Sequence, residues 1–232
     1  MVKRFRILLQ PVLCCLPIMM LFCCGIESVI YLDKPARVYY NSYLDDFSKR
    51  YCAFNTADSW NTANAAGFFQ GTEIYYRIYE QESDCTNDAA QIVRYNESNP
   101  SNSAQYLQDT KKYYRLTTTG SSKRPLIGSS SSDRAVRFRL QDYDAADPAV
   151  LTVGGASLGV PLRDTGILAE KRRFDDGNIS ANDADTQRAS SSSGLHEFWY
   201  VNFYAVSYGY DRAFKTLYSA IESLGYIKIK RN

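Results

Sequence analysis

Apolar and polar residues alternate with a period of two along much of the chain, which is typical of strands that bury one face. In "RAVRFRL" (134–140), Val136, Phe138 and Leu140 would face inward while the arginines between them face outward. The longest and most aromatic segment, "EFWYVNFYAVSYG" (197–209), is typical of a central strand that is buried on both sides. The same alternation predicts strands at 36–43, 49–55, 71–80, 112–119, 134–140, 148–155, 197–209 and 225–231.

Two segments interrupt this alternation. Residues 85–98 and 100–112 carry apolar residues at helical spacing and polar residues that suit a helix start, so we expect two short helices after the third strand. The polar or serine-rich stretches at 117–133, 170–194 and 189–194 predict mobile or exposed loops. Because neither a repeat nor a second apolar core pattern is present, we expect one domain.

The chain begins like a secretory signal. Three basic residues precede an uncharged run from Ile7 to Cys24, and two prolines and a glutamine within this run make it a poor permanent span. "LFCCG" (21–25) resembles the lipobox of bacterial lipoproteins, which implies cleavage before Cys24 and attachment of lipid to it. The alternative is an uncleaved membrane anchor. The expected divisions are a signal peptide (1–23), a lipidated tether (24–36) and a folded domain (37–232).

Removal of this leader changes the charge balance. It takes away three of the 27 Lys and Arg residues and none of the 25 Asp and Glu residues, which leaves 24 basic against 25 acidic residues. Binding to the phosphate backbone of nucleic acid requires a clear basic excess on one face, so nucleic acid is not an expected partner.

Two cysteines, Cys52 and Cys85, remain beside Cys24 after cleavage. An exported chain can oxidise such a pair, so the two are candidates for a disulfide, provided that their Cα atoms lie close enough. Two cysteines without a histidine cluster cannot hold structural zinc.

Three strand segments carry a resemblance to a known fold. "GTEIYYRIY" (71–79) is similar to the third strand of fibronectin type III-like domains, and "YVNFYAVSYGYD" (200–211) and "SLGYIKI" (223–229) look like the sixth and seventh. "CGIESVIYLDKP" (24–35) and "NPSNSAQYLQDTKKYYRL" (99–116) further resemble spirochaete lipoproteins of the Treponema type. The resemblance implies a mainly β fold, namely a fibronectin type III- or immunoglobulin-like β-sandwich with a short helical insertion. Relative to the plain domain, it has insertions at 85–112 and 141–196.

No reaction is indicated by the motifs. His196 is the single histidine, and the chain lacks a nucleophile elbow, a phosphate-binding glycine loop and H-E-x-x-H. We therefore expect no enzyme, no metal and no cofactor. A hydrolase that uses His196 beside the serines at 190–193 is the remaining enzymatic alternative.

The stretch "RFDDGNISANDAD" (173–185) is rich in oxygen ligands that could suit calcium. Its spacing does not fit an EF-hand loop, so a solvated turn is the favoured interpretation. The residues concerned are Asp175, Asp176, Asn178, Asn182, Asp183 and Asp185.

A tyrosine-rich surface is the candidate binding face. In a type III-like fold the third, sixth and seventh strands share a sheet, so side chains that alternate away from their isoleucines would lie together on its outer face. Tyrosine offers a large contact area with a polar tip, which binding faces favour. The alternatives are ordinary cross-strand pairing or cover by the inserted helices. The face comprises Tyr75, Arg77, Tyr79, Tyr226 and Lys228.

These patterns together predict a lipoprotein held at the cell envelope by lipid on Cys24, on the periplasmic leaflet or at the outer surface. Its expected role is binding or scaffolding with an unknown protein partner. A second hypothesis is a small-ligand carrier with a pocket between the sandwich and the helices. The hydrolase is the third.

Overall fold

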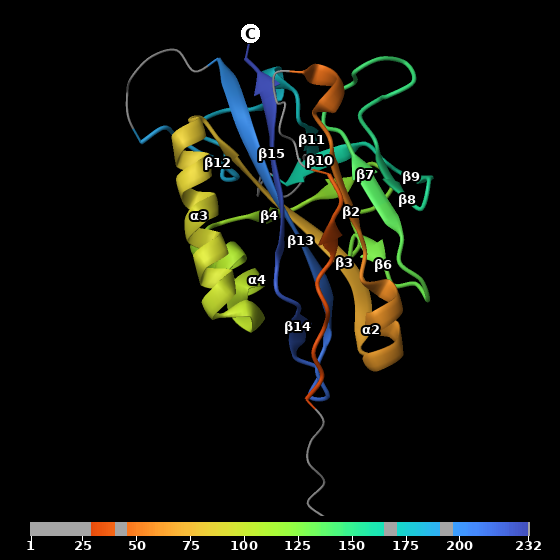
Figure 1. Ribbon diagram of the computed structural model, residues 1–232. Helices are drawn as coiled ribbons and strands as arrows, with labels where there is room; N and C mark the ends of the chain where they lie inside the picture. Colours follow the sequence, from red (N-terminus) through yellow and green to blue (C-terminus); the bar gives the residue numbers. More distant parts are fainter. Residues whose placement is uncertain (1–28, 40–45, 165–170, 191–196, 232) are drawn as a thin grey trace, which may run out of the picture. The chain divides into compact units, whose positions relative to one another are not determined.

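Two long antiparallel strands, β3 (Phe69–Tyr79) and β13 (Phe198–Tyr210), form the centre of the computed structural model, which describes residues 29–39, 46–164, 171–190 and 197–231 (Figure 1). The other side of β13 pairs with β14 (Thr216–Tyr218) and β15 (Glu222–Lys230). The other side of β3 pairs with β4 (Tyr114–Arg115), β6 (Ile127–Gly128) and, in parallel, β12 (Thr186–Gln187). These strands make up the central sheet. The prediction that the third strand and the last two predicted strands share a sheet is confirmed.

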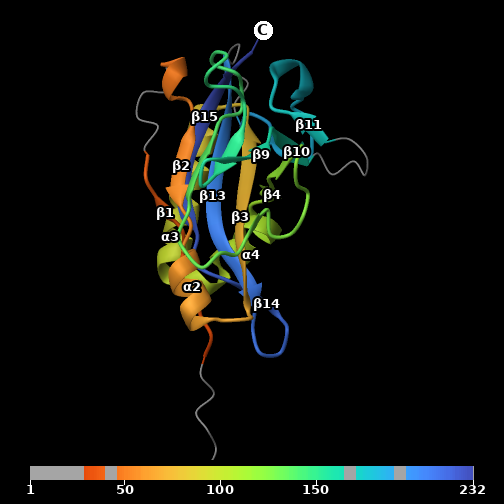
Figure 2. The same ribbon diagram turned by 90° about the vertical axis from the view of Figure 1, so that its right-hand side faces the viewer.

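Two smaller antiparallel sheets accompany it. The second sheet has the order β1 (Ala36–Arg37), β2 (Cys52–Asn55), β7 (Ala135–Phe138), β8 (Leu151–Val153) and β9 (Ala156–Gly159). The third sheet has the order β11 (Lys171–Arg173), β10 (Pro161–Asp164) and β5 (Thr117–Thr118), and it lies next to β4 (Figure 2). The fold is therefore mainly β with antiparallel sheets, as the alternation predicts.

The longest helix, α3 (Glu82–Ser98), follows β3 and packs on the face of the central sheet opposite to the second sheet (Figure 1). Three short helical turns continue it: η2 (Pro100–Asn102), α4 (Ser103–Gln105) and η3 (Tyr106–Thr110). The helices predicted at 85–98 and 100–112 are thus confirmed. The remaining helical segments are η1 (Phe47–Lys49), α2 (Asp58–Asn64) and η4 (Asp176–Asn178). Within the described residues, no helix is long and apolar enough to cross a membrane.

One face of the central sheet shares a core with the second sheet. The isoleucines Ile74 and Ile78 of β3 and Phe203 of β13 lie there with Phe54 and Phe138 of the second sheet, all fully buried. The rings of Phe138 and Phe203 meet edge to face with 5.1 Å between their centroids, a favoured geometry for aromatic pairs. The inward face predicted for 134–140 is therefore confirmed.

The opposite face of the central sheet is a second core, covered by α3 and the turns after it. Tyr75 and Tyr79 are both fully buried there, with Ile92 of α3 and Leu107 of η3 packed against them. The prediction that these tyrosines belong to an exposed binding face is therefore wrong. Alternation places them away from the isoleucines correctly, but the inserted helices, rather than water, cover the face they occupy.

The prediction of a disulfide between Cys52 and Cys85 is also wrong. Both residues are buried thiols. Cys52 lies in the first core and Cys85 in the second, so the central sheet separates them.

The prediction of an exposed loop at 170–194 is wrong for much of the part that the structure describes, residues 171–190. Strands β11 and β12 form within it, and Phe174 and Asp185 are fully buried. Phe174 packs edge to face on Tyr76 with 4.9 Å between ring centroids, which ties this segment to the first core.

Buried tyrosines should make the fold sensitive to alkali. Burial raises the pKa of Tyr75, Tyr76, Tyr79 and Tyr113 well above the ordinary value of 10.0. The unfolded chain then releases phenolic protons that the folded chain keeps, so stability is lost as the pH rises above the unfolded-state pKa. We expect a loss of up to about 1.4 kcal/mol per pH unit for each such tyrosine.

The measurement is the free energy of unfolding in urea at about pH 9 and about pH 11. Tyr143→Phe is the matched control, because it removes the hydroxyl of an exposed tyrosine and leaves the four buried ones in place. Equal stability of the wild-type chain at the two pH values would contradict the prediction.

Candidate functional site

A polar pocket of about 400 Å³ lies between the helical turns after α3 and strand β14. This size falls within the range of roughly 300–1,000 Å³ that ligand pockets occupy. Its lining comes from three distant parts of the sequence. They meet because the helical segment, which comprises α3 and the turns η2, α4 and η3, covers the face that β14 borders. The lining residues are Ser101, Asn102, Gln105, Gln108, Asp109, Arg124, Thr216, Leu217 and Tyr218.

Arg124 is held firmly in the wall of this pocket. Its Nε donates to Glu73 Oε1 at 2.8 Å, and its Nη2 donates to the Tyr218 hydroxyl. The guanidinium carbon lies 4.6 Å from the ring centroid of Tyr208, within cation–π distance. Gln108 donates to the same Tyr218 hydroxyl at 3.2 Å, so helix and strand are joined at the pocket floor.

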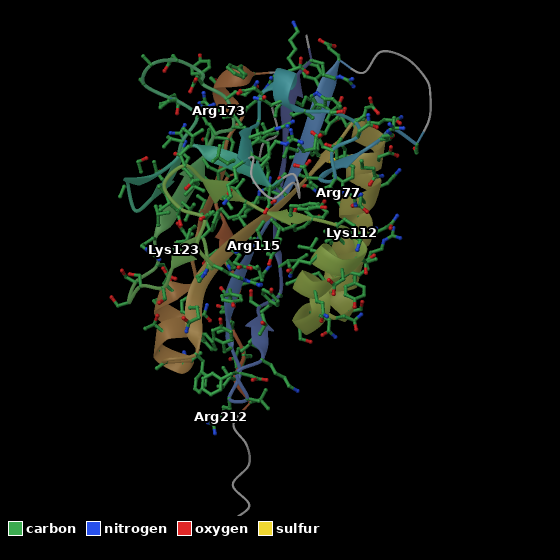
Figure 3. All side chains as sticks on the ribbon, turned by 180° about the vertical axis from the view of Figure 1, so that it is seen from behind. Arg77, Lys112, Arg115, Lys123, Arg173 and Arg212 are labelled. Carbon is green, nitrogen blue, oxygen red and sulfur yellow. The ribbon has the colours of Figure 1, made fainter. Side chains whose placement is uncertain are left out.

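Glu73 fixes this arrangement from inside the protein. It follows the strand alternation onto the helix-covered face, where its side chain is 1% exposed. A lone buried carboxylate is costly, and three donors offset that cost here. Tyr75 donates to Oε2 at 2.5 Å, and Arg124 donates to Oε1. Arg115, which is labelled in Figure 3, lies 3.5 Å from Oε1.

The charged residues of the pocket lining are one cation, Arg124, and one carboxylate, Asp109. Burial alone lowers the pKa of Arg124, but Glu73, Tyr218 and Tyr75 raise it by more, so its net pKa lies above the ordinary value and it stays charged. Arg115 and Arg124 both lie beside the Glu73 carboxylate, so the Arg124 side of the pocket is positive, while Asp109 lies elsewhere in the lining. A planar guanidinium held in one orientation suits carboxylate or phosphate oxygens, and the neighbouring amides suit hydroxyl groups.

A second polar surface lies on the outer face of the second sheet. The guanidinium carbons of Arg137 and Arg139 lie 4.3 and 5.2 Å from the ring centroid of Tyr51, and Tyr39 stacks on Tyr51 at 4.2 Å. Asp147 accepts hydrogen bonds from both arginines, at 3.0 and 2.6 Å. Arg139 points away from the core, as predicted, yet it is only 3% exposed. The turn η1 lies against it, and its guanidinium donates to two backbone carbonyls of that turn.

Arg163 lies among the acidic residues of 173–185. Its buried guanidinium donates to Asp183 Oδ2 and Asp185 Oδ1, both at 2.7 Å, and to Asp185 Oδ2 at 3.0 Å. Tyr76 donates to the same Oδ2 at 2.7 Å. The interpretation of this stretch as a solvated turn is therefore wrong for Asp185, which is fully buried. Within the described residues, no group of His, Cys, Asp and Glu is arranged to hold a metal ion.

The other residues of the predicted binding face do not form one exposed patch. Arg77 donates to the carbonyl of Lys111, Tyr226 donates to Glu82, and the Lys228 ammonium lies 5.4 Å from the Phe198 ring centroid. All three are half-buried. Cys24 and His196 lie outside the described residues, so the lipid site and the hydrolase hypothesis stay predictions.

Sequence reasoning missed Arg124 because it stands in the serine-rich stretch 117–133, which resembles a mobile linker. The tripeptide "KRP" (123–125) was the only local signal, and it does not reveal that Glu73 pairs with Arg124. Arg163 was missed for a different reason: its partners Asp183 and Asp185 lie 20 and 22 residues away, so no local pattern joins them to it.

No protein-family model, curated protein or solved structure matches this chain.

Replacement of Arg163 tests the buried network. Arg163→Leu leaves the fully buried Asp185 and the partly exposed Asp183 without their cation, and we expect a loss of about 3–5 kcal/mol in the free energy of unfolding. Arg137→Leu is the matched control, because Arg137 and Asp147 form an ion pair near the surface, and it should cost about 1 kcal/mol or less. Equal losses in the two variants, measured by urea unfolding, would contradict this role for Arg163.

Proposed function

We propose that the chain is an envelope lipoprotein whose folded domain is a binding module, anchored by lipid on Cys24. The support for the anchor is the charged start, the apolar run and the lipobox-like "LFCCG". The compact unit begins at Tyr31. A lipid on Cys24 would therefore lie about seven residues, or at most ~25 Å, from it.

The strand order supports a fibronectin type III- or immunoglobulin-like β-sandwich. One sheet contains β1, β2 and β7 in sequence, and the central sheet contains β4, β3, β13 and β15. These would correspond to strands A, B and E, and to C, F and G with an added edge strand, whereas β8, which follows β7 in the chain, occupies the place of strand D. The helical segment would then be an insertion after strand C.

The pocket beside Arg124 is the observation that carries the binding role. It lies between the helical segment and the sheet, as the small-ligand hypothesis requires. A pre-oriented guanidinium and several amides around a hollow of this size favour a small polar ligand with a carboxylate or phosphate group. The protein would hold such a ligand close to the membrane.

A protein partner is the second candidate, and the surface around Tyr51 favours it. Tyrosine and arginine are enriched at the centres of interfaces. Arg137 is 47% exposed at its side chain, and Tyr143, which lies beside Arg139, is 44% exposed.

Cys24→Ser should abolish lipid attachment. The serine variant offers no thiol for acylation, so we expect no incorporation of labelled palmitate and either a retained leader or release from the membrane. Cys23→Ser is the control, since the neighbouring thiol would be removed with the leader, and it should label normally. Normal labelling of Cys24→Ser would end the lipoprotein proposal.

Ligand binding at the pocket can be tested by thermal unfolding with a panel of small carboxylates and phosphates. At about 100 times its Kd, a bound compound should raise the Tm by roughly 5–10 °C. Arg124→Gln removes the charge and should lose this rise, whereas Arg137→Gln, away from the pocket, should keep it. A rise that persists in Arg124→Gln, or no rise in the wild-type chain with either class, would contradict the pocket's role.

A further inference from the structure

The hairpin between β13 and β14 ends in a tightly fixed turn. Asp211 Oδ1 accepts backbone hydrogen bonds from Ala213 and Lys215, both at 2.8 Å, and the Phe214 N–H donates to the Asp211 carbonyl at 3.0 Å. The backbone of the turn is therefore held by Asp211, and the side chains at its tip are not required to close it.

Phe214 occupies the position in this turn that favours glycine. Its φ is 57°, in the left-handed region that bulky residues rarely adopt, and its side chain is 80% exposed. A large apolar ring thus stands in water at a backbone position where it is unfavourable. Neither the core nor the turn accounts for it, which points to a contact outside the domain.

The same end of the domain carries the first residues of the compact unit. Asn61 of α2 accepts from the Asp33 N–H at 2.7 Å and donates to Ser207 Oγ of β13 at 3.1 Å, which ties the start of the chain to α2 and to the strand that leads into the hairpin. Figures 1 and 2 both show the described chain starting beside α2 and the β13–β14 hairpin. Arg212 lies at this end, far from Arg173 (Figure 3).

More aromatic surface gathers here. Tyr31 is 63% exposed, and its ring lies 4.7 Å from that of the half-buried Trp60 in α2. Arg212 and Lys215, both exposed, flank Phe214 in the turn. We call this group the hairpin end: Tyr31, Trp60, Arg212, Phe214 and Lys215. Aromatic rings next to basic side chains are the composition found where proteins meet the membrane interface.

We propose that the hairpin end contacts the lipid bilayer to which the chain is anchored. This rests on the proposed function, because lipid on Cys24 would bring Tyr31 to within ~25 Å of the bilayer. Phe214 enters the interface between headgroups and acyl chains, while Arg212 and Lys215 contact anionic headgroups. Two attachments, the lipid and the hairpin end, then fix which side of the domain faces the membrane.

Quenching by brominated lipid tests the contact directly. The full chain carrying Trp60→Phe and Phe214→Trp is reconstituted in vesicles of phosphatidylcholine with about one third phosphatidylglycerol, with bromine on the acyl chains near the glycerol. Trp199 is only 2% exposed and provides a constant background. We expect the emission of the substituted position to fall about twofold relative to unbrominated vesicles.

The control variant carries Trp60→Phe and Tyr143→Trp. Tyr143 packs against Phe47 in η1, which precedes β2, whereas α2 follows the other end of β2. The emission from position 143 in this control should not be quenched by the brominated lipid. Equal quenching of the two variants, or none in either, would overturn the proposal and leave the hairpin end to a different partner.

Phe214→Gly separates membrane contact from a role in folding. Glycine adopts this φ without strain, so the urea midpoint should be unchanged or higher. In Cys24→Ser protein from which the leader has been removed, sedimentation with the same vesicles should fall by ~10-fold or more, because the ring that enters the bilayer is lost. Unchanged sedimentation would overturn the proposal.

Failure of the anchor and failure of this inference give different results. The mass of the N-terminal peptide reports acylation independently of quenching. Quenching of Phe214→Trp in a chain without acyl groups would refute the anchor but support the contact. An acylated chain without such quenching would support the anchor and overturn the contact.

Discussion

Burial of both faces of β3 and β13 is the constraint on which the rest of the structure depends. Such strands have no face in water, so their polar side chains need partners inside the protein. Five of these partners come from five different covering segments. The pairs are Glu73 with Arg124, Tyr76 with Asp185, Tyr79 with Asp88, Asn202 with Tyr113, and Ser207 with Asn61. Polar groups on the central strands thus position the segments that enclose them.

The need for polar partners also places one arginine on each face of β3. On the helix side, Glu73 holds Arg124 at the wall of the pocket. On the other side, Tyr76 and Arg163 share Asp185. The two differ in what the guanidinium can still reach, since Arg163 is fully buried while the side chain of Arg124 is 38% exposed. Only Arg124 combines a fixed orientation with access to a ligand.

The sequence predicts much of the secondary structure, because period-two alternation and helical spacing are local. It identifies the opposite faces of 71–80 correctly but cannot say what lies on each. Tyr75 is as compatible with water as with a helix, and only the packing of α3 decides. Arg124, Arg163 and the pocket depend on pairs such as Glu73 with Arg124, which lie 51 residues apart and leave no local pattern. The position of Phe214 in a glycine-type turn was missed because "YDRAFKT" contains no glycine to mark it.

The central pairing also sets the order in which the domain can assemble. Ile78 pairs with Val201, and Thr72 pairs with Ser207, so β3 is synthesised well over a hundred residues before its main partner. During that interval its isoleucines and its strand edge have no native cover on the β13 side, and contacts of such long range are slow to form. The first core also draws Ile227 and Ile229 from β15, which arrives later still. We therefore expect the native first core to close only when β13 and β15 are available, late in synthesis.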